Sequence, residues 1–168
     1  MPAQDAALFG LGELIMNWKI VFIGGVAFYV AMFIVSFGTG YLIHSPEGVL
    51  FETYRATASF WRPELNADPP DMGALMPMWI ATGLVSALIA AGIYSVVRSS
   101  LAGPAWQRGL KFGLIAALFG LINALGYRGV FNLPDDIWQW WIVDATILHL
   151  VGGIVLGIVA EKVSPVRG

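Results

Sequence analysis

The chain contains four long and almost uncharged apolar runs, which cover about residues 19–43, 73–97, 110–127 and 137–160. The hydrocarbon core of a bilayer is about 30 Å thick, and a helix needs about 20 mostly apolar residues to cross it. Strands of a membrane barrel would alternate between apolar and polar residues, whereas these runs are apolar on every side. The sequence therefore predicts an all-α protein in which residues 1–168 form one membrane domain, a four-helix transmembrane bundle.

The composition excludes several other classes of protein. Apolar residues make up 58% of the chain and charged residues 12%, whereas a soluble domain carries about 25% charged residues. The net charge is −2 and no dense lysine and arginine cluster occurs, so we expect no nucleic-acid partner. The absence of cysteine excludes disulfide scaffolds, iron–sulfur clusters and cysteine-based zinc sites. No phosphate-binding, dinucleotide-binding or hydrolase motif occurs, and we therefore expect no cofactor, no metal site and no catalytic residues.

The charges of the connections predict the orientation of the bundle. Cytoplasmic connections of membrane proteins carry an excess of lysine and arginine. One side of the predicted bundle holds Lys19, Arg98, Arg108, Lys111, Lys162 and Arg167, and the other holds Arg55, Arg62 and Arg128. Both termini are therefore predicted to be cytoplasmic.

The connection between the first two runs has an internal pattern of its own. Ser45-Pro46-Glu47 is typical of a helix start, because it offers a capping hydroxyl, a proline in the first turn and an acidic residue. Leu50, Tyr54 and Trp61 then recur at helical spacing. The pattern predicts a short amphipathic helix over about residues 46–61, lying on the outer surface of the membrane. His44, Trp61 and Arg62 are the candidate site residues of this outer loop.

Small residues indicate where the helices touch. Helices in lipid associate by close packing at glycine, alanine and serine. Gly153 and Gly157 form such a motif in the fourth run, and Gly113 and Gly120 lie on one stripe of the third. These four glycines are predicted to form helix-packing surfaces.

Asp144 is an ionisable residue inside the fourth run, and such residues are expensive in lipid. Asn123 lies at a similar depth in the third run, with Tyr127 and Arg128 close to its end. The sequence predicts an intramembrane polar cluster in which Asp144 bonds to these side chains and fastens the third helix to the fourth. A carboxylate that binds a proton or cation and a contact to another subunit remain alternatives.

His149 is the second ionisable residue of the fourth run and lies near the middle of the membrane. It follows Asp144 by five residues, which separates the two side chains by about 140° around a helix, so they do not form an acid–base pair or a metal site. We expect a buried neutral imidazole that bonds across a packing surface. A single-histidine haem or a chlorophyll-type magnesium ligand is the alternative.

Several short motifs occur in a characteristic order. Asn17-Trp18-Lys19 precedes the first run, Trp61-Arg62-Pro63 lies in the outer loop, and Trp140-Trp141 precedes the Gly-x-x-x-Gly motif. Over about residues 17–160 this order resembles a group of small, uncharacterised bacterial membrane proteins with four spans. The resemblance implies the four-span fold and a location in the inner membrane of a bacterium, and it implies no activity.

Taken together, these features predict a non-catalytic structural or accessory subunit of a larger membrane assembly or of a homo-oligomer. Its expected partners are the lipid bilayer and other membrane subunits or further copies of itself. One alternative is a small transporter or channel that uses Asp144 and His149. A second is a pigment-, haem- or lipid-binding membrane protein, or an enzyme that acts on a lipid-like substrate through His44.

Overall fold

The computed structural model of the chain describes residues 16–166, which contain helices and connections and no strand. Four apolar helices of 24 to 29 residues run the length of the molecule. At a rise of 1.5 Å per residue they are about 36–43 Å long, which is enough to cross a bilayer core. The predicted all-α fold with four membrane-spanning helices is confirmed.

The spans begin and end close to the predicted positions. The first comprises a short π-helix, η1 (Ile20–Gly24), and α2 (Gly25–His44). The second is α4 (Met72–Val97), which η4 (Arg98–Ser100) extends by one turn. The third is α5 (Ala105–Arg128), and the fourth is α6 (Asp135–Val163). The prediction started the third span at residue 110, five residues late, because α5 begins with polar and basic residues at the end of the bundle.

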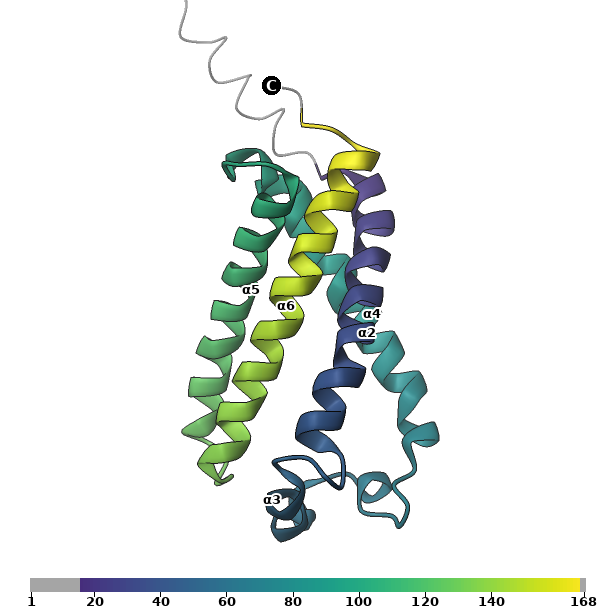
Figure 1. The fold of residues 1–168 in the computed structure, drawn as a ribbon, viewed down its shortest axis with the longest axis vertical. Coiled ribbons are helices and arrows are strands. Elements are labelled where there is room, and N and C mark those ends of the chain that lie inside the picture. Colours follow the sequence, from purple (N-terminus) through teal and green to yellow (C-terminus); the bar gives the residue numbers. More distant parts are fainter. Residues whose placement is uncertain (1–15, 167–168) are drawn as a thin grey trace, which may run out of the picture.

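The helices lie side by side in the order α5, α6, α2 and α4 (Figure 1). Asn17 and Ser164 meet at one end of the bundle, where the Asn17 side-chain amide donates to the Ser164 hydroxyl at 2.9 Å. We call this the termini end, and we call the opposite end, which carries the short helix α3 (Phe51–Ala56), the α3 end.

Glycines allow α5 and α6 to pack with their backbones in contact. A side chain at Gly109 would strike the carbonyl oxygen of Gly153, and one at Gly113 would strike that of His149. A Cβ atom at Gly157 would lie 2.8 Å from the Cα of Gly109. Such close approach gains dispersion contacts along the whole interface, which is the main source of helix association in lipid.

The buried core lies toward the termini end, where all four spans meet. Ile20, Tyr94, Leu156 and Ala160 are buried there, and the ring of Phe112 packs edge-on against Tyr94 with centroids 5.2 Å apart. Toward the α3 end, α4 leans away from α5 and α6 (Figure 1). The bundle is therefore closed at one end and more open at the other.

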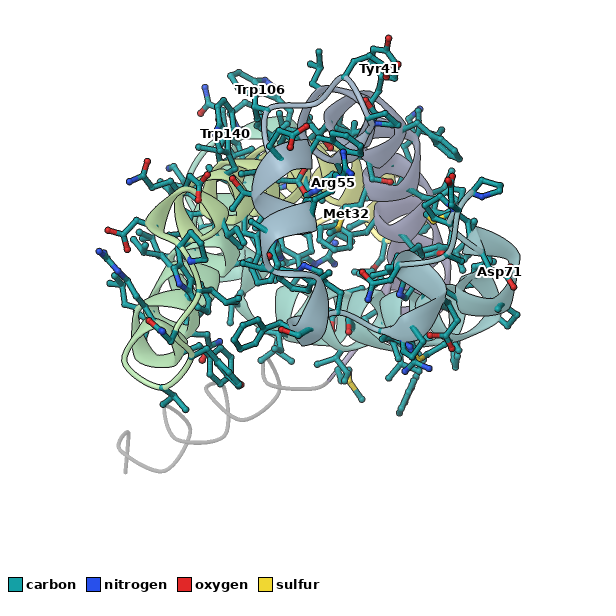
Figure 2. The ribbon with its side chains drawn as sticks, turned by 90° about the horizontal axis from the view of Figure 1, so that it is seen from below. Met32, Tyr41, Arg55, Asp71, Trp106 and Trp140 are labelled. Carbon is teal, nitrogen blue, oxygen red and sulfur yellow. The ribbon has the colours of Figure 1, made fainter. Side chains whose placement is uncertain are left out.

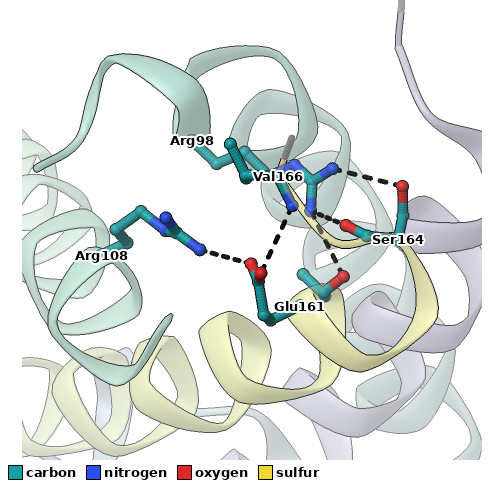
Figure 3. A network of polar contacts seen from close by, with 6 residues as sticks. Arg98, Arg108, Glu161, Ser164 and Val166 are labelled. Atoms are coloured by element: carbon teal, nitrogen blue, oxygen red, sulfur yellow. Dashed lines mark hydrogen bonds and ion pairs between the residues drawn. The ribbon is translucent and has the colours of Figure 1, made fainter. Parts of the chain in front are cut away.

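A polar network closes the termini end (Figure 3). The Arg98 guanidinium donates to the carbonyl oxygens of Ser164 at 2.6 Å and Ala160 at 3.3 Å. These carbonyls lie at the end of α6, where the helix leaves acceptors unpaired and carries partial negative charge. Arg108 of α5 forms an ion pair with Glu161 of α6. The network thus ties the ends of α4, α5 and α6 together.

Most of the remaining helix surface is not covered by other parts of the chain that the structure describes. Only 22–28% of the most apolar window of each span is buried inside the molecule. Seen from the α3 end, Tyr41 and Trp140 project outward at the rim, whereas Met32 lies between the helices (Figure 2). An apolar surface of this extent needs lipid around it, so the chain is a multi-pass membrane protein.

The predicted helix over residues 46–61 is wrong in its extent. Residues 45–50 form a turn, and three short helices follow: α3, η2 (Ala58–Phe60) and η3 (Pro63–Leu65). The turn folds back so that the backbone N–H groups of Val49 and Leu50 donate to the carbonyls of Leu42 and Ile43, both at 3.1 Å. These bonds satisfy carbonyls at the end of α2, which favours the turn over a helix start at Pro46.

Candidate functional site at the α3 end

Four polar side chains from three helices form a row at the α3 end, and three of them are joined by hydrogen bonds. His44 is the last residue of α2, Tyr54 lies in α3, and Trp141 and Asp144 are close together on α6. The Trp141 indole N–H donates to the Tyr54 hydroxyl at 2.8 Å, and the same hydroxyl lies 2.8 Å from Nδ1 of His44. Nε2 of His44 lies 3.9 Å from Oδ2 of Asp144. We call these four residues the α3-end cluster.

The direction of the bonds follows from which groups can donate. An indole N–H can only donate, so the Tyr54 oxygen accepts from Trp141 and its own proton is available for Nδ1 of His44. A neutral His44 then carries its proton on Nε2, which faces the Asp144 carboxyl. Two hydrogen bonds therefore lead from the indole to the imidazole, and Nε2 of His44 faces the Asp144 carboxyl at 3.9 Å without a hydrogen bond to it.

Aromatic contacts hold the loop after α3 against α6. The ring of Trp61 packs edge-on against Tyr54 and Trp141, with centroids 5.2 and 5.9 Å apart. Its indole N–H donates to the Tyr54 carbonyl at 3.1 Å. In addition, the Thr53 hydroxyl donates to Asp136 at 2.6 Å. The predicted apolar stripe of this segment thus faces the bundle, where Leu50 is fully buried, and not the lipid.

Asp144 is the member of the cluster whose hydrogen bonds are incomplete. Its Oδ1 atom is buried and has no hydrogen-bond partner among the residues that the structure describes. Its distance of 3.9 Å to His44 exceeds the usual 2.7–3.2 Å of a hydrogen bond. A buried carboxyl with an unpaired oxygen is costly, so Asp144 is the candidate functional residue of the cluster.

A cavity of about 270 Å³ lies beside the cluster between α2 and α6. Its lining is apolar except for Thr39, and Val49 of the turn borders it at the α3 end. The residues that line it are Thr39, Leu42, Ile43, Val49, Trp140, Val143 and Ile147. A cavity of this character can take an apolar chain, and it offers only the Thr39 side chain as a polar group for orienting a substrate.

The geometry does not favour nucleophilic or metal chemistry. A tyrosine nucleophile needs a lowered pKa, whereas burial raises the pKa of the Tyr54 phenol, an effect that the bond from Trp141 offsets only in part. Among residues 16–166, no group of three or more potential metal ligands of the histidine, cysteine or carboxylate type lies together. The cluster fastens α3 to the bundle through the bonds of Tyr54 with Trp141 and His44.

The predicted polar cluster around Asp144 is wrong in its partners. Asp144 faces His44 of α2, whereas Arg128 pairs with Asp135 at 2.8 Å. Asn123 and Tyr127 lie on the exposed surface of α5. The packing of α5 on α6 turns these residues away from Asp144, although their depth in the membrane is similar.

The other predicted site residues are dispersed. Nδ1 of His149 lies 2.6 Å from the Ala145 carbonyl of its own helix, and the ring lies beside Phe28, so the expected bond to another helix is not formed. Arg62 pairs with Glu64 at 3.2 Å, outside the cluster. Gly113, Gly153 and Gly157 lie in the α5–α6 interface, whereas a Cβ atom at Gly120 would meet nothing within 4 Å.

Sequence reasoning missed the partnership of His44 with Asp144 and the roles of Tyr54 and Trp141. Two features of the sequence could have indicated that these residues lie together. His44 and Asp144 both lie toward the outer ends of their spans, and Tyr54 shares a helical stripe with Trp61. Comparisons of the chain with models of protein families, with curated proteins and with solved structures give no match.

Proposed function

We propose that the chain is a non-catalytic structural or accessory subunit of a membrane assembly. The observation that carries this proposal is how the polar groups are used at both ends of the bundle. The α3-end cluster joins α2, α3 and α6, and the network of Arg98, Arg108 and Glu161 joins α4, α5 and α6. Polar side chains that bond one helix to another make the bundle rigid, and few polar side chains then remain to bind a substrate.

A second feature supports the same proposal. α5 packs on α6 along its length, and much of the rest of its surface is bare. Its exposed large side chains include Leu114, Ile115, Leu118, Phe119, Ile122 and Leu125. Such a face suits contact with a further membrane helix as well as with lipid.

We test this role by purifying a tagged chain from its native membrane in mild detergent. We expect other membrane proteins, or several copies of the chain, to elute with it, as mass spectrometry and light scattering would report. A solitary monomer would contradict the proposal. If vesicles containing that monomer also showed ion flux that the Asp144→Asn variant lacks, transport would become the better assignment.

We also propose that the protein lies in a bacterial inner membrane with both termini in the cytoplasm. The resemblance to bacterial four-span proteins supports the membrane, and the positive-inside rule supports the orientation. The basic residues near the termini end are Lys19, Arg98, Arg108, Lys111 and Lys162, against Arg55, Arg62 and Arg128 near the α3 end.

The absence of cysteine makes the orientation directly testable. Ser59 lies at the α3 end and Ser99 at the termini end, and both are exposed. In cells whose outer membrane has been permeabilised, a membrane-impermeant maleimide should label Ser59→Cys and spare Ser99→Cys until the inner membrane is broken. The reverse labelling order would invert the proposed topology.

A further inference from the structure

One face of α5 is covered near the termini end and uncovered farther along the helix. Phe112 lies on this face and packs against Tyr94 of α4. Toward the α3 end α4 leans away (Figure 1). Residues of α5 that share the face of Phe112 but lie nearer the α3 end therefore have no helix in front of them.

Asn123 is the polar residue on this uncovered stretch. It follows Phe112 by eleven residues, which is a net rotation of about 20° and an advance of about 16 Å. Its side chain is exposed and makes no hydrogen bond within residues 16–166. It lies about 7 Å from the end of α5 at Arg128. Its exposed neighbours on α5 are the apolar Phe119 and Ile122 and, one turn nearer the α3 end, Tyr127. The amide therefore lies on a mostly apolar, uncovered face of a membrane-spanning helix without a partner in residues 16–166.

An unpaired amide in hydrocarbon is unfavourable, because lipid tails offer neither donors nor acceptors. A second amide removes the penalty, since each carboxamide has both a donor and an acceptor. In a dimer with a two-fold axis along the membrane normal, the same residue of each copy lies at the same depth. Asn123 is thus complementary to itself.

The surroundings of Asn123 allow another helix to come close. A Cβ atom at Gly120 would meet nothing within 4 Å, and Ala116 lies one turn farther along the same side. Small residues at this spacing let two helix backbones approach, which brings short side chains such as asparagine within bonding distance.

We propose that α5 packs against α5 of a second copy of this chain, with the two Asn123 amides hydrogen-bonded to each other. The inference rests on the proposed function, and it names the partner that the exposed face of α5 takes. Another protein's helix could supply a polar group, but only a second copy matches Asn123 in both chemistry and depth by symmetry.

The experiment uses single cysteines in the full chain, which has none of its own. Ala116→Cys places a thiol on the same side of α5 as Asn123, two turns toward the termini end, and Leu118→Cys is the matched control on α5. Leu118 is exposed and lies five residues from Asn123, about 140° around the helix. Under mild oxidation in native membranes, Ala116→Cys should form a disulfide dimer at least about tenfold faster than Leu118→Cys.

Asn123→Leu in the Ala116→Cys chain should reduce this rate about tenfold, and Asn123→Gln should retain it. Trp fluorescence of both variants before oxidation verifies that the bundle is folded. Equal dimer formation at positions 116 and 118, or no effect of Asn123→Leu, would overturn the second copy as partner. If the dimer proposal fails but other membrane proteins still elute with the native chain, the accessory role remains supported. A solitary monomer would contradict both the dimer and the accessory role.

Discussion

Substitution of Gly113 by alanine should destabilise the bundle by about 2 kcal/mol, and substitution by leucine should prevent α5 and α6 from packing. A Cβ atom at this position would strike the carbonyl oxygen of His149 and lie 3.2 Å from the Cα of Leu150. Both are backbone atoms, so no side-chain rotation relieves the contact. The loss is measured by thermal or detergent-induced unfolding of the purified protein, followed by tryptophan fluorescence.

Gly38→Ala is the matched control for this prediction. Gly38 also lies inside a membrane-spanning helix, but a Cβ atom there would meet nothing within 4 Å. Removing a glycine from a helix interior gains about 0.5–1 kcal/mol when no contact is harmed. We therefore expect Gly38→Ala to be neutral or slightly stabilising. Equal stability of the two alanine variants would show that the glycine contact between α5 and α6 is not required.

Substitution of Tyr54 by phenylalanine should make the docking of α3 on the bundle less favourable, by about 1–3 kcal/mol of free energy. The change leaves the indole N–H of Trp141 and Nδ1 of His44 without their shared partner. Hydrogen–deuterium exchange over residues 51–61 should become about tenfold faster or more. Tyr41→Phe is the control, because Tyr41 is 62% exposed and its substitution should leave the exchange unchanged.

The same tyrosine predicts how the docking of α3 depends on pH. Burial raises the pKa of the Tyr54 phenol above its ordinary value of 10.0; the bond from Trp141 opposes this, and the charges of Asp144 and Asp136 add to it. A pKa that is higher in the folded state means that the stabilisation is complete below pH 10 and is lost as the pH rises beyond it. Absorbance titration should show late-ionising tyrosines whose number falls by one in Tyr54→Phe; an unchanged titration would refute the assignment.

The spans could be predicted from the sequence because the bilayer imposes a local requirement. Each helix must satisfy its own backbone and present apolar side chains, so length and composition suffice to identify it. The packing of Gly113 against α6 could likewise be anticipated from residue size and spacing. Gly120 could not be separated from Gly113 in this way, because the sequence does not give the angle at which two helices cross.

The α3-end cluster could not be predicted, because it depends on which helices are neighbours. Asp144 was expected to face α5, the helix that precedes α6 in the chain, and the carboxyl faces His44 of α2 instead. The predicted start of the outer helix was wrong for a related reason. Ser45-Pro46-Glu47 has the residues of a helix start, but the exposed carbonyls of α2 compete for the next backbone N–H groups.

The central place of α6 has a consequence for biogenesis. η1, α2 and α5 all pack on this helix, and the cluster of α3 also closes onto it. Yet α6 is the last of the four spans to leave the ribosome. The first three can enter the lipid one by one, and α4 can pack on α2 before α6 is made, but the contacts of Tyr54 and His44 with Trp141 and Asp144 form only once α6 is present. A nascent chain stalled before Asp135 therefore lacks every contact that α6 makes with η1, α2, α3 and α5.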